Sequence, residues 1–224
     1  MTARELGAPT SPLLVGVAGG SGSGKSNLAR ALLAALGPTR TALLEHDAYY
    51  RDRSTVPPDR RATLDFDTPD AFDQRLFLEH LSALRAGLPV RPPVYCFRTH
   101  RRTGTAAVVV PRPIVLVEGI LLLWEPAVRA ILDLTIYLDA PERVRLERRL
   151  ARDVAERGRS ADVVLTQFAT TVREAHRTYV EPTRAMADLV LSTTGRIEPI
   201  AEIAAAVILD RFARRGGDRA RIAS

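Results

Sequence analysis

A glycine-rich stretch at residues 19–26, GGSGSGKS, constrains this chain more than any other part of its sequence. An apolar run precedes it at residues 13–18, and leucine and alanine residues at helical spacing follow it. Glycine residues let several backbone N–H groups turn toward one anion, and the N-terminus of the following helix adds partial positive charge there. The order of strand, glycine loop and helix therefore predicts a phosphate-binding loop, with a simple structural turn as the alternative.

The predicted ligands of a nucleoside triphosphate are the eight residues of this loop: Gly19, Gly20, Ser21, Gly22, Ser23, Gly24, Lys25 and Ser26. We expect Lys25 to reach the terminal phosphates and the hydroxyl of Ser26 to bind Mg²⁺. The chain has 32 lysine and arginine residues, and Lys25 is its only lysine. Because arginine is used everywhere else, the lysine marks a position where a compact ammonium group is needed.

Length and charge limit the classes of protein to consider. With 224 residues, the chain suits one α/β domain, predicted at residues 1–214, with disorder at residues 1–11 and in a tail at residues 215–224. The net charge of +6 arises from arginines that are interleaved with acidic residues along predicted helices. We therefore expect no nucleic-acid partner.

Cysteine content and hydropathy bear on location. The single cysteine, Cys96, cannot form an intramolecular disulfide, which fits a reducing cytoplasm. No signal peptide is evident, and the longest apolar run, residues 114–124, is too short to cross a membrane. We expect a cytoplasmic protein without a membrane partner.

Apolar runs and helical periodicities alternate along the chain. The predicted strands lie at residues 13–18, 41–45, 114–119, 134–139 and 188–192, and the predicted helices at 25–36, 69–85, 141–157, 161–179 and 200–212. Thr68 is the expected N-cap of the second helix, with Pro69 as its first residue. This alternation predicts a three-layer α/β fold around a mostly parallel sheet.

Two carboxylates lie at the ends of predicted strands. Asp47 follows the strand at residues 41–45, and Glu118 lies near the end of the strand at 114–119. Ligands bind at the carboxyl ends of parallel strands, so Asp47 would lie beside the phosphate-binding loop if the first two strands are near neighbours. Glu118 has the position of the carboxylate that helps to hold Mg²⁺ in phosphoryl-transfer folds.

An insertion at residues 90–112 reads as a β-hairpin with strands at 92–97 and 107–110. Alternation places Tyr95 and Phe97 on one face, with His100 in the turn. These side chains could hold a flat ring or form a small satellite core. Asp67 precedes the predicted helix cap. A role in capping or loop solvation and a role in the functional site are equally compatible with its position.

A helical lid is predicted at residues 141–160. Its expected apolar, buried stripe consists of Leu146, Leu150 and Val154, and another face carries Arg145, Arg149 and Arg152. The helix breaks at residues 157–160. Clustered arginines on a helix–break–helix suit a mobile lid over phosphates, and a solvated charged face is the alternative.

Together these features predict a nucleotide-dependent phosphoryl transferase with a small acceptor. A GTPase is disfavoured because the chain has no Asn-Lys-x-Asp-like motif, and a motor or AAA-type ATPase is disfavoured because the chain is short.

Over residues 13–191 the chain resembles the uridine kinase (uridine/cytidine kinase) family of P-loop NTPases, which is related to the phosphoribulokinases. Up to residue 121, the matching stretches are GGSGSGKS at 19–26, DAYYR at 47–51, FDTPDAFD at 66–73, PVYCF at 93–97 with His100 and Arg102, and EGIL at 118–121. Beyond residue 121 they are Arg149, RD at 152–153, ERGRS at 156–160, Gln167, EPT at 181–183 and AD at 187–188. The Glu-Arg-Gly-Arg stretch with Gln167, and the Tyr-x-Phe-x-x-His hairpin, are the most specific of these.

The resemblance implies a role for each matching residue. Asp47 would take the proton from the 5′-hydroxyl of a nucleoside and would join Ser26 and Glu118 at the Mg²⁺ site. Arg152 and Arg157 would close on the phosphates as catalytic residues beside Lys25. The implied substrate-binding residues are Tyr50, Phe66, Asp67, Tyr95, Phe97, His100, Arg149, Arg159 and Gln167. Within that set, the ribose would be bound by Asp67, Arg149 and Gln167, and the pyrimidine by Tyr95, His100 and Phe97.

The implied reaction is Mg²⁺-dependent transfer of phosphate from ATP, or GTP, to uridine or cytidine, giving the 5′-monophosphate in pyrimidine salvage. The implied fold is nucleoside-kinase-like, with an inserted hairpin arm and a helical lid. Family members are commonly homotetramers, so a homo-oligomer is implied as well.

Alternatives remain at this point. One is a related kinase for another ribosyl or sugar acceptor, phosphoribulokinase-like or nicotinamide riboside kinase-like. Another is a nucleotide-binding regulatory protein without catalysis, although such a protein would not need Asp47. The chain departs from the common family pattern at Ala48, at Cys96 and in the loop at residues 192–195, which bears on the preferred base and donor.

Overall fold

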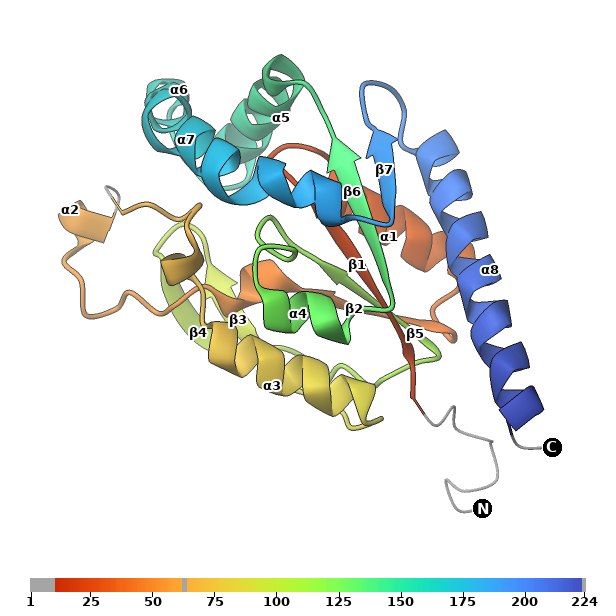
Figure 1. Cartoon of the computed structure of the whole chain (residues 1–224). Coiled ribbons are helices and arrows are strands. Elements are labelled where there is room, and N and C mark those ends of the chain that lie inside the picture. The colour runs from red at the N-terminus through yellow and green to blue at the C-terminus, as the bar shows by residue number, and fades with distance from the viewer. Residues whose placement is uncertain (1–10, 62–63, 223–224) are drawn as a thin grey trace.

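The structure, a computed structural model, describes residues 11–61 and 64–222. Its main sheet has five parallel strands in the order β2-β5-β1-β6-β7 (Figure 1). The strands are β1 (Leu13–Gly19), β2 (Thr41–Glu45), β5 (Ile114–Glu118), β6 (Leu134–Asp139) and β7 (Leu189–Ser192). Every residue of β1 and β5 is buried, as expected for strands covered on both faces. The predicted α/β fold with a mostly parallel sheet is confirmed.

Helices cover both faces of this sheet (Figure 1). Leu13, Val15 and Val17 of β1 pack in one cluster with residues of α1 (Lys25–Leu36) and α8 (Glu198–Ile222). Leu14 and the alternate residues of β5 pack in the other cluster, with α3 (Gln74–Arg85) and α4 (Pro126–Ile131). The alternation of side chains along each strand thus divides the core into two layers, one on each side of the sheet.

The lid lies above the carboxyl ends of the strands. It comprises α5 (Glu142–Ala155) and the break after it, and α6 (Ala161–Gln167) follows. The helix that begins as α6 continues through α7 (Arg173–Ala175), with π-helical segments at Phe168–Val172 and His176–Val180. It then leads into β7 by way of a 3₁₀ segment, Glu181–Met186.

The buried face of α5 differs from the prediction. Leu146 and Leu150 are only partly buried and Val154 is 45% exposed, whereas Arg145, Arg149 and Asp153 are buried. The predicted apolar stripe was therefore wrong. The physical reason is that Arg149 and Asp153 pair with each other and Arg149 also bonds to Ser21 of the phosphate-binding loop, so the burial of these two charges is compensated.

The hairpin arm consists of β3 (Pro93–Cys96) and β4 (Arg101–Thr105). Its second strand begins earlier than the predicted residues 107–110. His100 takes up a left-handed conformation (φ 53°) and donates its backbone N–H to the Cys96 carbonyl at 2.8 Å, which closes a tight turn. Arg102 then ties β4 to the body of the protein through bonds to the Tyr50 carbonyl and to Asp73.

Two helix boundaries also differ from the prediction. The helix expected from Pro69 begins at Gln74, because Asp73, not Thr68, accepts the capping bond, from Leu76 N–H. The short α2 (Pro58–Arg61) lies in the preceding loop. At the other end, α8 runs to Ile222, beyond the predicted end at 212 and into the expected tail, and Arg215 anchors it to the Pro12 carbonyl and to Asp133.

Residues 1–10 and 223–224, which belong to the segments expected to be disordered, lie outside the described residues. Across residues 11–61 and 64–222, no helix combines the length and hydropathy that a membrane span needs.

Candidate active site

The phosphate-binding loop joins β1 to α1, as the sequence predicted. Gly22 and Gly24 have φ values of 78° and 101°, and a Cβ at Gly22 would collide with the backbone of Arg145. Glycine is therefore required where the lid meets the loop. Lys25 is buried and donates to the Gly20 carbonyl at 3.1 Å, and its burial lowers the pKa of its ammonium group.

Ser26, at the start of α1, donates a hydrogen bond of 2.9 Å to Glu118 Oε1 at the end of β5. Glu118 is buried, and its burial together with the nearby charge of Asp47 raises the pKa of its carboxyl to about 7. β5 lies between β1 and β2, so the first two strands are not paired neighbours. Asp47, in the 3₁₀ turn after β2, nevertheless lines the same cavity as Lys25 and Ser26.

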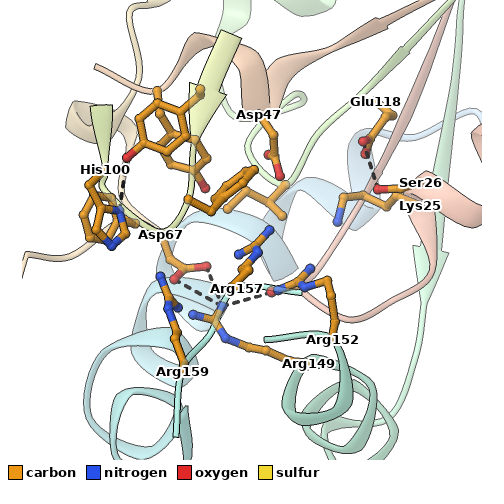
Figure 2. A pocket seen from close by; sticks show the side chains of 16 residues that line it. Lys25, Ser26, Asp47, Asp67, His100, Glu118, Arg149, Arg152, Arg157 and Arg159 are labelled. Atoms are coloured by element: carbon orange, nitrogen blue, oxygen red, sulfur yellow. Dashed lines mark hydrogen bonds and ion pairs between the residues drawn. The ribbon is translucent and has the colours of Figure 1, made fainter. Parts of the chain in front are cut away.

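Two adjoining cavities open at this end of the sheet. The first cavity lies between the phosphate-binding loop, the hairpin arm and the lid (Figure 2). The second cavity continues along α1 and the outer side of the lid and is lined there by Gly22, Gly24, Asn27, Arg30, Arg98 and Arg148. The residues that line both are Lys25, Ser26, Asp47, Phe97, Glu118, Arg152 and Arg157. The two cavities therefore meet at the predicted catalytic residues.

One wall of the first cavity carries a charged pair. Arg149 Nη1 donates to both carboxylate oxygens of Asp67, at 3.3 and 3.4 Å, and to Ser21 Oγ at 2.9 Å. Both residues are at least 92% buried. The capping role left open for Asp67 is not what the geometry shows, since its carboxylate faces the lid arginine.

The opposite wall is aromatic. Phe66 and His100 are stacked, with ring centroids 4.1 Å apart, and the Tyr95 hydroxyl lies 3.2 Å from His100 Nδ1. Tyr50 packs against Tyr95 with centroids 5.1 Å apart. Burial, with the charges of Arg159 and Arg157, lowers the pKa of His100 to about 4, so the imidazole is neutral at physiological pH. This wall offers flat surfaces and neutral hydrogen-bonding groups.

The lid closes the cavities from below in Figure 2, where Arg152 and Arg157 face Asp47 and Lys25 across the space. The guanidinium of Arg157 lies over the Phe97 ring, 3.8 Å from its centroid. Gln167 is not among the described residues that line either cavity; it accepts a bond of 3.1 Å from Arg159.

Some residues of the site were not predicted. Arg148 lines the second cavity and donates to the carbonyl oxygens of Ser23 and Thr193. Its spacing from Arg145 and Arg152 was the available signal. Asp153 is completely buried among the lid arginines, and no role was predicted for it from the sequence.

The donor set at Ser26 and Glu118 fits Mg²⁺. A hydroxyl and carboxylates are hard oxygen ligands, and Mg²⁺ commonly takes one or two carboxylates with the remaining positions filled by phosphates and water. Within residues 11–61 and 64–222, no cluster of three or more histidine, cysteine or acidic side chains suits a softer or wholly protein-bound metal. Asp47 Oδ1 is buried without a hydrogen-bond partner among the described residues.

Comparison with known proteins agrees with the phosphate-binding site described above. A model of the Phosphoribulokinase / Uridine kinase family matches residues 14–198. The chain belongs to this family. Its sequence is 44% identical over 192 residues to the uridine kinase of Chloroflexus aurantiacus, covering 86% of this chain and 91% of that relative. The resemblance stated from the sequence, and with it the assignment to a family of kinases, is confirmed.

Two solved structures share the fold of this chain. The phosphoribulokinase of Rhodobacter spheroides superposes with a TM-score of 0.56 at 18% identity, covering 85% of this chain and 75% of that one. A protein named as a possible uridine kinase from Bacillus stearothermophilus gives a TM-score of 0.58 at 19% identity, covering 82% and 90% of the two chains.

Proposed function

We propose that this chain transfers the γ-phosphoryl group of ATP to the 5′-hydroxyl of uridine and of cytidine, forming the nucleoside 5′-monophosphate in pyrimidine salvage. The observation that carries this proposal is the meeting of two cavities at Lys25, Asp47 and the lid arginines. Both cavities are lined by the phosphate-binding loop, and the first also has paired charges and aromatic rings. The family membership and the 44% identity to a uridine kinase support the acceptor.

Asp47 is the proposed general base. As the nucleoside 5′-oxygen bonds to the γ-phosphorus, the bond from that phosphorus to the β,γ-bridging oxygen breaks, ADP leaves, and the hydroxyl proton passes to Asp47. Its unpartnered Oδ1 is free to receive that proton. Phosphoryl transfer depends mainly on positioning and charge, and Lys25, Arg152 and Arg157 supply positive charge where the two cavities meet.

The first cavity is proposed to hold the nucleoside. Asp67 and Arg149 offer a carboxylate and a guanidinium to the ribose hydroxyls, while Tyr95 and neutral His100 offer hydrogen bonds to the pyrimidine edge. The walls for a flat base are Tyr50, Phe66 and Phe97. Arg159 lines the same cavity and is held by Gln167, which therefore acts through Arg159 in this structure.

The second cavity is proposed to hold the phosphate donor, ATP or GTP. Gly22 and Gly24 of the loop and Arg148 of the lid line this cavity where the triphosphate would bind. Ser26 and Glu118, with Asp47 nearby, would hold Mg²⁺, which neutralises phosphate charge when bound. Among the other expected loop ligands, Gly19, Gly20 and Ser23 would contribute through backbone N–H groups.

A coupled assay of ADP release tests the proposal. With ATP and Mg²⁺, the acceptors to compare are uridine, cytidine, adenosine, nicotinamide riboside and ribulose 5-phosphate. We expect turnover on uridine and cytidine, loss of about 100- to 10,000-fold in Asp47→Asn, and wild-type rates in Asp70→Asn, which removes an exposed carboxylate. Turnover confined to a sugar phosphate or to nicotinamide riboside would overturn the acceptor assignment and leave the kinase assignment standing.

We further propose that residues 1–214 form one kinase domain, that it acts in the cytoplasm, and that it assembles as a homo-oligomer. The absence of a second cysteine for a disulfide supports the location. Light scattering coupled to size-exclusion chromatography would test the assembly, and a monomer at micromolar concentration would contradict it.

A further inference from the structure

Asp153 lies at the centre of the lid arginines and has no assigned role in the proposed mechanism. It is completely buried, with 0% of its surface exposed. Its carboxylate accepts hydrogen bonds from Arg152 Nε at 2.8 Å and Arg159 Nη1 at 3.0 Å. The same carboxylate forms ion pairs with Arg157 at 3.5 Å and Arg149 at 3.7 Å. One carboxylate thus contacts four guanidinium groups.

The backbone of Asp153 is tied to the same segment. Its carbonyl oxygen accepts bonds from Arg157 N–H at 3.2 Å and Arg159 N–H at 3.1 Å. The break after α5 is therefore fixed to the helix through both the side chain and the main chain of a single residue. A change in the position of Asp153 would move Arg157 and Arg159 together.

The four arginines face different cavities. Arg149 and Arg159 line the first cavity but not the second, whereas Arg152 and Arg157 line both. Asp153 lines neither, so it cannot touch an acceptor or a donor in this structure. It is nevertheless in direct contact with all four of these arginines.

The Asp153 carboxylate reduces the electrostatic repulsion among the four arginines. Four guanidinium groups within a few ångströms repel one another, and a buried carboxylate among them offsets that repulsion. Burial alone would raise the pKa of the Asp153 carboxyl, but Arg152, Arg157 and Arg149 outweigh burial and hold the pKa below its usual range. The carboxylate is therefore charged at neutral pH, and the group retains positive charge for phosphates.

We propose that Asp153 is a positioning residue that couples the two cavities, so that a nucleoside engaged by Arg149 and Arg159 sets Arg152 and Arg157 for the triphosphate. The inference rests on the proposed function only in taking the first cavity as the acceptor site and the second as the donor site. Asp153 acts by holding the arginines and touches no reacting atom.

Asp153→Asn is the decisive variant, because it keeps the shape of the side chain and removes its charge. Calorimetric titration would measure the affinity for uridine alone, for the Mg²⁺ complex of the non-hydrolysable analogue adenosine 5′-(β,γ-imido)triphosphate alone, and for each in the presence of the other. In the wild type we expect each ligand to raise the affinity for the other by roughly 5- to 150-fold. In Asp153→Asn we expect this factor to fall to about one, with kcat reduced about 100-fold.

A matched control is available on the same helix. Glu147→Gln also removes one negative charge from α5, but Glu147 is exposed and pairs only with exposed Arg143 among its described contacts. We expect the wild-type coupling factor and kcat in this variant. A purely structural role for Asp153 would lower the melting temperature and leave the coupling factor unchanged.

A second variant covers the case in which Asp153→Asn does not fold. Arg159 does not line the second cavity, so Arg159→Gln should leave the affinity for the triphosphate analogue alone within a few-fold of wild type. It should nevertheless reduce the effect of uridine on that affinity. A wild-type coupling factor in folded Asp153→Asn, or in Arg159→Gln, would overturn the inference. A wild type that binds both ligands with coupling but does not phosphorylate uridine would overturn the proposed function alone.

Discussion

The imidazole of His176 lies so close to Gly20 that a Cβ on Gly20 would be 2.8 Å from both Cε1 and Nδ1 of the ring. His176 belongs to a π-helical segment beyond the lid, and Gly20 belongs to the phosphate-binding loop. The Gly20 carbonyl in turn accepts the bond from the Lys25 ammonium. The helix after the lid therefore supports Gly20, which holds the ammonium group of Lys25.

This contact predicts the effect of Gly20→Ala. The added methyl group would have to displace the His176 ring or the loop, which costs about 1–3 kcal/mol for overpacking. A displaced loop would also misplace Lys25, and a shift of about 1 Å lowers kcat by about 100-fold. Thermal unfolding and steady-state kinetics would measure the two effects.

The matched control is Gly195→Ala, because a Cβ on Gly195 has nothing within 4 Å. Truncation of the ring in the double variant Gly20→Ala, His176→Ala should restore part of the lost stability. If Gly20→Ala is as stable and as active as the wild type, the close contact does not hold the loop.

The Ser26–Glu118 hydrogen bond predicts a shared role in Mg²⁺ binding. Ser26→Ala and Glu118→Gln should each raise the Mg²⁺ concentration for half-maximal activity by about 10- to 100-fold. Because the two side chains are in contact, the effects in the double variant should add to less than the sum of the single ones. Titration of activity with Mg²⁺ at saturating ATP gives these values. Additive effects, or an unchanged Mg²⁺ requirement, would contradict a common metal site. Glu79→Gln, which changes an exposed side chain of α3, serves as the control.

The four histidines predict loss of stability in acid. Burial lowers the pKa of His46, His100 and His176 to about 4 and also lowers the pKa of His80. An unfolded histidine has a pKa of about 6.5, so between about pH 4 and 6.5 the unfolded chain binds more protons than the folded protein. Stability therefore falls as the pH decreases through this window.

Thermal unfolding measured from pH 7.5 to pH 4.5 would show this dependence as a falling melting temperature. Near pH 5, unfolding of His100→Gln should take up about one proton fewer than unfolding of the wild type. Its melting temperature should therefore depend less steeply on pH. A melting temperature that is constant from pH 6.5 to pH 5 would contradict the neutral, buried state of these rings.

The contacts of Asp133 predict that its substitution lowers the stability of the protein but not its activity. Its carboxylate accepts from Leu14 N–H at 2.8 Å, Arg85 at 2.6 Å and Arg215 at 2.8 Å, and so ties α3 and α8 to β1. Asp133→Asn should cost about 1–3 kcal/mol, since hydrogen bonds to a charged group are lost. The melting temperature should fall by roughly 2–4 °C for each kcal/mol.

In Asp133→Asn, kcat/KM should stay at the wild-type value, because Asp133 lines neither cavity. Asp210→Asn, which removes an exposed carboxylate paired with Arg214, should change neither quantity. A loss of turnover in Asp133→Asn at temperatures where it is folded would show that the anchoring of α8 reaches the active site.

Parts of this protein with a local cause were predictable from the sequence. The phosphate-binding loop is eight consecutive residues, and glycine at positions such as Gly22 and Gly24 supplies conformations that other residues rarely adopt. The strands of the main sheet follow from continuous apolar runs, since a strand covered on both faces needs such a run. Family resemblance extended the prediction to residues spread along the chain, and the structure gathers nearly all of them around two cavities.

Other features depended on contacts between distant residues. The position of β5 between β1 and β2 brings Glu118 beside Ser26, and no local pattern specifies which strands pair. The turn at His100 set the register of the hairpin, because one left-handed residue decides where β4 begins.

The lid shows most clearly the difference between features set by local sequence and features set by distant contacts. The sequence of α5 by itself determined a helix and the spacing of its arginines, because these follow from propensity and from 3.6 residues per turn. Which face is buried was decided by the tertiary structure. Arg149 and Asp153 pair with each other within the helix, and they enter the interior because Asp67, distant in the chain, and Arg157 and Arg159, beyond the end of α5, also neutralise their charges. Partly exposed Leu150 and exposed Val154 face outward as a result, since burial of a charge depends on the partners that the fold supplies.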